Sequence, residues 1–569
     1  MEPGTRNALP AGSGRPGTGE GALPGDEKRP SMGWKWALPL IAVAAFLAIA
    51  PTIASGSAGG HDFIYHLATW LDAARTSGLG GWASGANFGF GEPRFIFYTP
   101  LPARLGSAVA SLLPPDAVPG TYAFLVLMLA GAAMFPLARQ WFPPAHAAMA
   151  AAFYTVSPYL LICIYHRSSF TELLADAFCP LLLLYAIRLG QTGEAIAPLA
   201  AVLAAIWISD LPAAVVAGYA LALIILVLAV VHRSWAPLWR GAAAGALGLA
   251  LAAFFVLPAA YEQRWVDITP ARQRFYMPHF WRWAYDPGNG LWFWAVISGL
   301  LCGMIALSVT AIGFSWSWRR QQRVPWLVMV TLIGTSIFML LPFSYVFWVH
   351  LPELRLVQFP WRCMPELTAC TTILLVAAMA RFPVRLLMIV LGAIAFVAGL
   401  ACVSTAHWYP GEARILEQQN ARNHGYEGDP QYMPHNARKE VFTALREMPL
   451  VASSNRNTTG QIMLWQPQSK AIMIDSPTPA QLTLHLMNYP AWQVTINGNP
   501  VASQSDKYGR LAVPIPAGTS TVEARFVITP DRKLGAAISV IALLILAGLF
   551  IARRRERVLP PLRTIARPA

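Results

Sequence analysis

Residues 34–66 read WKWALPLIAVAAFLAIAPTIASGSAGGHDFIYH, and this stretch determines the class of the protein. Its first part, from about Trp36 to Ile53, is apolar enough to cross a bilayer, and tryptophan and proline flank it. The ionisable cluster Gly60-His61-Asp62-Phe63-Ile64-Tyr65-His66 follows a few residues later, so it emerges at a membrane surface. An aspartate in such a position is a candidate functional residue.

The composition is that of a polytopic membrane protein. Of the 569 residues, 56% are hydrophobic and only 12% are charged, whereas a soluble domain carries about 25% charged residues. The formal net charge of +14 comes from Lys and Arg clustered in short connectors between apolar runs, which does not indicate nucleic-acid binding. The six cysteines include no C-x-x-C pair, so neither a disulfide framework nor a zinc site is predicted.

Apolar runs predict a mainly α-helical, polytopic membrane fold with about twelve transmembrane helices. They cover residues 34–54, 120–138, 146–164, 172–188, 197–209, 212–231, 241–260, 291–316, 324–342, 365–381, 384–405 and 534–552. Two runs, 172–188 and 197–209, are short for full spans, which leaves half-helices or longer helices as alternatives. The first run begins late and has membrane length, so we expect a retained first helix and no cleavable signal peptide.

Arginine positions orient these helices. If the N-terminal tail is cytoplasmic, every second connector is cytoplasmic too, and those connectors carry the arginines that the positive-inside rule requires. They are Arg139, Arg188, Arg233, Arg240, Arg319, Arg320, Arg323, Arg381, Arg385 and Arg553 to Arg555. We therefore expect both termini to be cytoplasmic and the alternate loops, above all 55–119, to face outwards.

Four segments follow from this topology. We expect a disordered cytoplasmic tail at 1–33, a transmembrane domain at 34–405, an extracytoplasmic β-rich domain at 406–530, and a final transmembrane helix with a basic cytoplasmic tail at 531–569. In the β-rich segment apolar and polar residues alternate, and Asn497-Gly498 supplies a hairpin turn. A small β-sandwich on the outer face is predicted.

Asp62 stands at the start of an amphipathic pattern. Residues 63–75 predict a helix lying on the membrane, with His66 one turn after Asp62. Asp62 is then either an N-cap or a functional carboxylate, a general base or a metal ligand, with His61 and His66 assisting. If the protein holds a metal, Asp62 is the residue that we expect to bind it.

Further polar residues lie at other outer helix ends. Arg167 stands at a helix N-terminus, where a guanidinium and the helix dipole together suit an anion. Ser169 and Glu172 form a capping box, which leaves Glu172 as either a cap or a ligand-binding residue. Asp210 precedes a helix that begins with proline, and we expect it to be a cap.

Two later outer loops add charged and aromatic residues. Glu262 and Arg264 begin a basic cluster that calls for an anionic partner, either lipid head groups or a lipid-linked phosphate. This cluster continues with Arg272, Arg274, His279 and Arg282. In Gln358-Phe359-Pro360-Trp361-Arg362, Trp361 and Arg362 are either interfacial anchors or ligand-binding residues, and a polar residue stands on each side of a rigid turn.

The predicted topology brings all these residues to one face, although cytoplasmic arginines alone determined it. We therefore predict a single site there. Its catalytic residues would be Asp62, His61 and His66, and its substrate-binding residues would be Arg167, Glu172, Glu262, Arg264, Gln358, Trp361 and Arg362.

These residues carry a resemblance to known families. The chain resembles a bacterial family of membrane proteins labelled 6-pyruvoyl-tetrahydropterin-synthase-related, and it is similar to the YfhO-like membrane proteins. The string from Gln358 to Arg362 is the most specific matching piece. The others are Gly60 to Phe63 with Trp70, Asn87 to Pro93, Arg167 with Glu172, Pro258 with Tyr261-Glu262, Tyr489 to Trp492, and Asn497-Gly498.

These families in turn look like the GT-C class of integral membrane glycosyltransferases, which use a polyprenyl-phosphate sugar and an essential acidic residue in the first outer loop. The resemblance implies that Asp62 is the catalytic base and that the acceptor is a glycan, lipid or protein. It also implies a bacterial inner membrane with a periplasmic or extracellular active face, contacts with membrane lipids and no nucleic acid. The first loop lacks an Asp-x-Asp or Glu-x-Asp pair, so the sequence leaves open whether the protein uses Mg²⁺ or Mn²⁺ as a cofactor.

Two other functions fit the sequence. A transporter or flippase of a lipid-linked or anionic substrate would carry ionisable residues at mid-membrane depth. The predicted helix interiors are nearly free of charge, which favours chemistry at the surface. A non-catalytic envelope-assembly protein, whose β-domain binds cell-wall polymer, is the other alternative.

Overall fold

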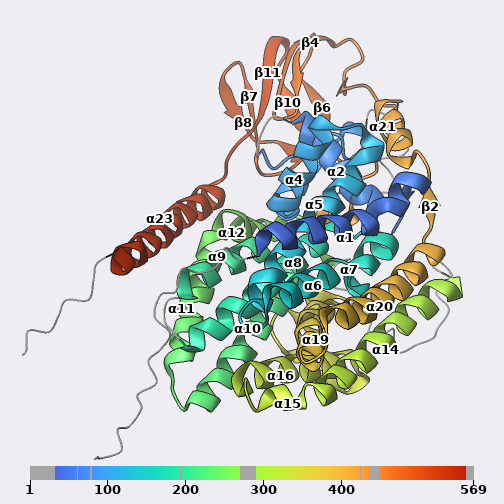
Figure 1. The fold of residues 1–569 in the computed structure, drawn as a ribbon. Coiled ribbons are helices and arrows are strands. Elements are labelled where there is room, and N and C mark those ends of the chain that lie inside the picture. The colour runs from blue at the N-terminus through green and yellow to red at the C-terminus, as the bar shows by residue number, and fades with distance from the viewer. Residues whose placement is uncertain are drawn as a thin grey trace, which may run out of the picture.

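The computed structural model describes residues 33–60, 62–76, 80–191, 195–269, 290–422, 425–435, 437 and 447–558. Within these ranges a bundle of apolar helices carries a layer of short helices and a β-sandwich at one end (Figure 1). We call this end the sandwich end of the bundle. His61, the predicted tail before Gly33, and the basic residues Arg272 to Arg282 lie outside the described residues.

Nine helices of the described chain are long and apolar enough to cross a membrane. They comprise α1 (Trp34–Ser55), α5 (Val118–Ala138), α6 (Pro144–Thr155) continued by α7 (Pro158–Ile162), α8 (Phe170–Gln191), α10 (Leu211–His232), α16 (Arg323–Leu340), α19 (Met364–Met379), α20 (Val384–Thr405) and α23 (Pro530–Val558). The prediction of a mainly α-helical, multi-pass membrane protein is thus confirmed.

The shorter predicted runs have different outcomes. The run 172–188 is extended by α8 to 22 residues, whereas 197–209 is the 12-residue helix α9 (Ile196–Trp207). The run 291–316 is α14 (Gly290–Phe314). The 22 residues of α8 are enough to span a membrane, whereas the 12 residues of α9 are too few for a full crossing.

The predicted run 241–260 is not one straight helix. It is broken into α11 (Ala236–Leu251) and α12 (Ala253–Glu262), which are bent by 74°. On α23, the Ser539 hydroxyl accepts a hydrogen bond from the Phe254 amide at 2.9 Å and donates one to the Ala250 carbonyl at 3.0 Å. The last helix therefore satisfies backbone groups that the break exposes.

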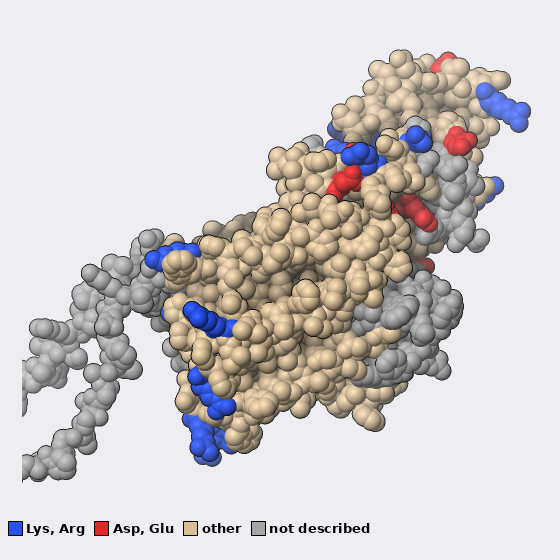
Figure 2. Space-filling model, turned by 45° about the vertical axis from the view of Figure 1, so that its right-hand side comes forward, with Lys and Arg blue, Asp and Glu red and all other residues tan. Residues whose placement is uncertain are grey.

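Charged residues distinguish the two ends of the bundle. At the end away from the sandwich, Arg188 donates to the Gln140 side chain at 2.9 Å and Arg240 donates to the Leu189 carbonyl at 3.3 Å. Connectors that we predict to be cytoplasmic therefore meet there. Figure 2 shows an uncharged band across the middle of the molecule, between blue side chains at the lower left and the charged residues near the sandwich. Which end faces the cytoplasm stays a prediction.

The first outer loop folds into a layer over the bundle. It contains α2 (Phe63–Arg75), α3 (Arg94–Phe97) and α4 (Pro100–Leu112). The predicted bounds of α2 are confirmed, but the helix does not lie open on a membrane. It packs against α4 and α21 (Glu412–Arg422), and it buries Asp72, which accepts hydrogen bonds from the Gly85 amide at 3.1 Å and the Tyr426 hydroxyl at 2.9 Å. Its polar face therefore contacts protein.

The predicted β-sandwich is present between α21 and α23. One sheet has the order β3 (Val451–Ser453), β6 (Ala480–Met487), β10 (Arg510–Ile515) and β9 (Gln504–Ser505). The other has the order β4 (Thr459–Gln466), β5 (Ser469–Ser476), β11 (Gly518–Phe526), β7 (Trp492–Ile496) and β8 (Asn499–Val501). Asn497 and Gly498 form the predicted hairpin turn with φ values of 51° and 81°.

The sandwich and the first outer loop share one hydrophobic core. Trp82 and Phe90, from the loop, are buried among the strands, and the Phe90 ring stacks on His485 with centroids 3.5 Å apart. The Met487 amide also donates to the Phe90 carbonyl at 3.0 Å. The aromatic residues of this loop thus join the sandwich to the bundle.

Candidate functional site

Gly60 lets the chain that carries Asp62 pack directly on the turn after α7. The Gly60 amide donates to the Ser168 hydroxyl at 2.9 Å, and the Asp62 amide donates to the Arg167 carbonyl at 3.1 Å. A Cβ atom at Gly60 would lie 2.3 Å from the Arg167 carbonyl carbon, a distance that real Cβ atoms do not reach. Only glycine fits this approach, which brings Asp62 to Arg167.

Gly59 contacts residues 407–412 on the opposite side of the same segment. Its amide donates to the His407 carbonyl at 2.9 Å, and a Cβ there would lie 2.2 Å from the Tyr409 ring and 3.5 Å from Glu412 Oε2. The two glycines therefore pass between the Arg167 turn on one side and the segment 407–412 on the other. Asp62 follows immediately after this passage.

Asp62 occupies the predicted N-terminal position of α2 but does not act as its side-chain cap. It is the N-cap residue by position, yet its carboxylate makes no cap hydrogen bond to the helix. The side chain is half-buried. The capping alternative is therefore not supported by this geometry, and the role of general base is a proposal. Asp210, by contrast, is confirmed as a cap, because it accepts a hydrogen bond from the Ala213 amide at 2.9 Å.

Arg167 and Arg362 bind the same carboxylate, that of Glu172. The two Arg167 terminal nitrogens donate to the two Glu172 oxygens at 2.8 and 2.7 Å, and Arg362 Nε donates to Glu172 Oε2 at 3.0 Å. All three residues are buried, and the Tyr159 hydroxyl also donates to Glu172. With both guanidiniums and the carboxylate ionised, these three side chains carry a net positive charge, and the Arg167 backbone is bonded to that of Asp62.

The capping-box alternative for Ser169 and Glu172 is not supported by their hydrogen bonds. The Ser169 hydroxyl donates to Glu172 Oε2 at 3.3 Å, and the Ser169 amide donates to the Cys163 carbonyl at 2.9 Å, whereas a capping box would bond the Ser169 amide to the Glu172 carboxylate. The two arginines provide closer and charged partners. Glu172 therefore holds Arg167, from the short helix η3 (Cys163–Arg167), against Arg362, from η8 (Pro360–Cys363).

A strained turn precedes Arg362. Gln358 has φ 64° and ψ −48°, and the Phe359 amide donates to the Val357 carbonyl at 2.7 Å, which together define the rare γ-turn with positive φ. The same Val357 carbonyl accepts a hydrogen bond from Arg362 at 3.1 Å. The turn therefore helps to hold this guanidinium, and such strain is typical of functional sites.

Trp361 borders the cluster. Its ring stacks on Phe359 with centroids 4.6 Å apart and planes 8° from parallel. The Arg167 guanidinium carbon lies 6.0 Å from the centre of the Trp361 ring. The structure thus brings Asp62, Arg167, Glu172, Trp361 and Arg362 together, with Gln358 at the adjoining turn.

His66 lies beneath this group in an aromatic environment. Its Nδ1 is 2.8 Å from the Tyr98 hydroxyl, and its ring contacts those of Trp70 and Phe170. Burial, with smaller contributions from Arg94 and Arg167, lowers the pKa of His66 from 6.5 to about 3. The imidazole is therefore neutral at physiological pH.

Glu262 and Arg264 lie in a second cluster, at the joint between α12, α23 and the sandwich. Glu262 accepts hydrogen bonds from the Tyr489 hydroxyl at 2.6 Å and from Arg532 at 2.7 and 2.9 Å. The Arg264 guanidinium is exposed and stacks 3.7 Å from the Tyr261 ring centre. Glu262 therefore fastens the sandwich to the bundle, and the structure does not place it with Arg167.

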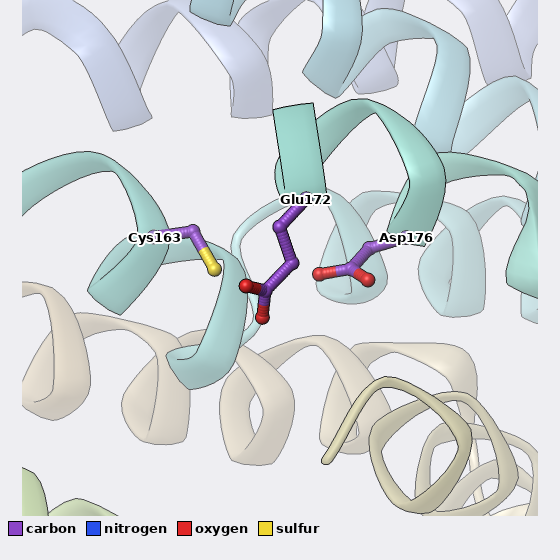
Figure 3. Close-up of side chains that lie close together, drawn as sticks. All are labelled: Cys163, Glu172 and Asp176. Carbon is purple, nitrogen blue, oxygen red and sulfur yellow. The ribbon is translucent and has the colours of Figure 1, made fainter. Parts of the chain in front are cut away.

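One group of described residues has the spacing of a metal site, but it does not suit Mg²⁺ or Mn²⁺. Cys163, Glu172 and Asp176 each place one ligand atom within 4.8 Å of the others, and Figure 3 shows Glu172 between the other two. Both Glu172 oxygens are already bound by Arg167, whose positive charge would repel a cation. A thiol is also a poor ligand for these hard ions. Asp62 as a metal ligand stays a prediction.

Three further acidic residues at the sandwich end were not among the predicted site residues. Asp176 and Glu366 are buried, and each has one carboxylate oxygen that lacks a hydrogen-bond partner within the described chain. Asp176 could have been singled out as an acidic residue inside a predicted span. Glu412 carries no sequence signal, because it looks like any acidic residue at the start of a polar helix.

The fold and this cluster define a polytopic membrane protein with a β-sandwich and a buried Arg–Glu–Arg group at the sandwich end. No protein-family model matches the sequence, and no curated protein matches it. Among solved structures, one of a mutant mycobacterial arabinofuranosyltransferase AftD aligns at TM-score 0.44 and 16% identity, over 66% of this chain and 28% of that chain. Another mycobacterial AftD structure aligns at TM-score 0.41 and 17% identity, over 66% of this chain and 26% of that chain. The chain thus aligns with little more than a quarter of AftD.

Proposed function

We propose that this chain is a GT-C-type glycosyltransferase that transfers a sugar from a polyprenyl-phosphate donor to a glycan, lipid or protein acceptor, with Asp62 as general base. The hydrogen bond between the Asp62 amide and the Arg167 carbonyl carries the proposal. It joins the Asp62 backbone to Arg167, whose side chain shares Glu172 with Arg362. A base next to paired cations at one end of a helix bundle suits a reaction in which a phosphate leaves.

The proposed reaction is a displacement at the anomeric carbon. The acceptor hydroxyl oxygen bonds to that carbon, while the bond from the carbon to the phosphate oxygen breaks and its electron pair stays on the phosphate. Asp62 takes the hydroxyl proton, and polyprenyl phosphate leaves with one additional negative charge. Arg167 and Arg362 stabilise that charge. The polyprenyl chain anchors the donor in the bilayer, so no nucleotide is needed.

In this mechanism Glu172 is a positioning residue. It holds the two guanidiniums together without reaching the reacting atoms. The Arg167 and Arg362 side chains are only 8% and 10% exposed, so a phosphate reaches them after a neighbour is displaced. We expect this neighbour to be Trp361, which is partly exposed and borders Arg167.

The remaining predicted residues take roles at the margin of this site. We propose that neutral His66 supports α2 beneath Asp62 and that Gln358 contacts the donor from its strained turn. Exposed Arg264 would meet an anionic lipid head group. The proposal includes a bacterial inner membrane with the sandwich end outside, and a divalent metal at Asp62 stays open.

A transporter of a lipid-linked or anionic substrate is the second candidate, and one observation favours it. Asp176 and Glu366 lie inside apolar spans, are buried, and have carboxylate oxygens without hydrogen-bond partners among the described residues. Buried carboxyls at membrane depth are typical of ion-coupled transport. Both residues lie within the first two turns of their helices at the sandwich end, which fits a surface site better.

A reconstitution experiment separates these functions. The purified protein in liposomes is given radiolabelled polyprenyl-phosphate hexoses and pentoses, with alkyl glycosides as acceptors. The glycosyltransferase proposal expects label on the alkyl glycoside from at least one donor. Movement of intact donor between leaflets without transfer would support the transporter instead, and neither transfer nor movement would favour a non-catalytic protein.

A further inference from the structure

We propose that Glu412 is a second carboxylate of the Asp62 site and binds hydroxyl groups of a sugar acceptor, an inference that rests on the glycosyltransferase function proposed above. Glu412 begins α21 and stands far from Asp62 in the sequence. Its placement, its lack of partners and its charge support this role.

Backbone pairing brings the Glu412 segment to the Asp62 segment. β1 (Ser57–Ala58) pairs antiparallel with β2 (Trp408–Tyr409), and the Gly59 amide extends the pairing by donating to the His407 carbonyl. The chain that leaves the first span therefore runs beside the chain that enters α21. Glu412 and Asp62 lie just beyond the two ends of this short ladder.

Gly59 lets the Tyr409 ring pack against the chain that leads to Asp62, and the Glu412 carboxylate lies next to this contact. A Cβ atom at Gly59 would come within 3.5 Å of Glu412 Oε2, and the Tyr409 ring closes the other side. Gly60, the next residue, packs on Arg167. Glu412 and Arg167 therefore flank the two glycines that lead into Asp62.

The Glu412 carboxylate has no partner within the described chain. Its Oε2 atom is buried without a hydrogen bond, and burial raises its pKa. Glu417, on the same helix, pairs with Arg75 at 3.7 Å instead. A position in the first helical turn favours an acidic residue but does not require that its oxygen be buried. An unpaired, partly buried carboxylate beside the glycines that lead to a candidate base indicates a missing ligand.

The charge of Glu412 selects the class of that ligand. A carboxylate repels the phosphate of the donor. Arg167 and Arg362, on the other side of the glycines, would bind that phosphate instead. It accepts hydrogen bonds from hydroxyl groups, and these bonds are strengthened by its charge. An uncharged, polyhydroxylated acceptor therefore fits Glu412, and Asp62 lies between the donor side and the acceptor side.

Glu412→Gln tests this assignment, with Glu417→Gln as the matched control on the same helix. Both variants are reconstituted with the donor that the wild type uses. Transfer to an octyl glycoside is measured against acceptor concentration, and hydrolysis of the donor by water is measured without acceptor. We expect Glu412→Gln to raise the KM for the octyl glycoside about tenfold or more and to leave donor hydrolysis unchanged. Glu412→Asp should recover part of the affinity, and Glu417→Gln should match the wild type.

Three results would overturn the assignment. An unchanged acceptor KM in Glu412→Gln would show that Glu412 does not bind the acceptor. An equal loss of transfer and hydrolysis would assign it a structural or donor role, and a changed Mg²⁺ or Mn²⁺ requirement would assign it to a metal. If the wild type transfers no sugar from any donor, the glycosyltransferase proposal itself fails, and this inference falls with it.

Discussion

The backbone amide of Asp62 donates a hydrogen bond to the carbonyl oxygen of Arg167, at 3.1 Å. This bond connects the first outer loop to the turn between two membrane helices. Because the Arg167 side chain binds Glu172, and Glu172 also binds Arg362, three segments that are distant in the sequence meet at one place. The contact depends on Gly60, which lies against the same turn.

Gly60→Ala should destabilise the protein and reduce its transfer activity. The new Cβ would lie 2.3 Å from backbone atoms of Arg167, so one of the two segments must shift. We expect a loss of about 1 to 3 kcal/mol in the free energy of unfolding, measured as a lower Tm in detergent. Gly218→Ala is the control, since nothing lies within 4 Å of a Cβ in that helix, and it should be neutral or stabilising. Equal Tm values for the two variants would refute the close approach.

Glu172→Gln should be more damaging than the loss of an exposed acidic residue. It leaves two buried guanidiniums without a counter-charge, which costs about 3 to 5 kcal/mol. Thermal unfolding with and without lipid measures the change. Glu523→Gln, which breaks an exposed pair with Arg525 at 2.9 Å, should cost less than about 1 kcal/mol. A Glu172→Gln protein as stable as Glu523→Gln would contradict the paired cluster.

The lowered pKa of His66 predicts how the free energy of unfolding depends on pH. Its pKa is about 3 in the folded protein and 6.5 when exposed, so between these values the unfolded chain binds a proton that the folded protein does not. The free energy of unfolding therefore falls as the pH drops through this window, by on the order of 2 kcal/mol at pH 5. His66→Gln removes this pH-dependent contribution of His66 to the free energy of unfolding. The Tm of the variant should therefore fall less than that of the wild type between pH 7 and pH 5. Parallel decreases would show that His66 is not held neutral.

Glu262→Gln should loosen the sandwich while leaving the sandwich itself folded. The change removes the charge that binds Arg532 and weakens the acceptor for Tyr489. Hydrogen exchange should increase at residues 527–532, between β11 and α23, and stay slow in the central strands. Asp475→Asn, on an exposed position of β5, is the control and should leave exchange at the joint unchanged. Unchanged exchange in Glu262→Gln would mean that other contacts hold the joint.

Periodicity and charge predicted much of the architecture, because both act locally along the chain. Apolar length placed α1 and α20 to within a few residues, and alternation with Asn497-Gly498 predicted strands of the sandwich. The break before Ala253 could not be predicted, because Ser539, far along the sequence, satisfies the groups that it exposes.

The site was predicted less completely, because the role of each residue there depends on which side chains it contacts, and the sequence does not show these contacts. Arg167, Glu172 and Arg362 were candidates, but the sequence does not show that one carboxylate binds both arginines. Glu262 looked equivalent to Glu172, yet its partner Arg532 belongs to the last helix and places it at the joint. Glu412 had no signal at all, since only the pairing of β1 with β2 brings its segment beside Gly59.

The most direct test of the central claim is the transfer rate of Asp62→Asn in liposomes that contain the donor used by the wild type. Asp116→Asn is the control, because Asp116 lies in the same outer loop and forms a solvent-accessible ion pair with Arg414 at 3.3 Å. If Asp62 is the general base, Asp62→Asn should lose about 10²-fold or more in kcat and still bind donor, while Asp116→Asn keeps the wild-type rate. Transfer by Asp62→Asn at the wild-type rate would contradict the account.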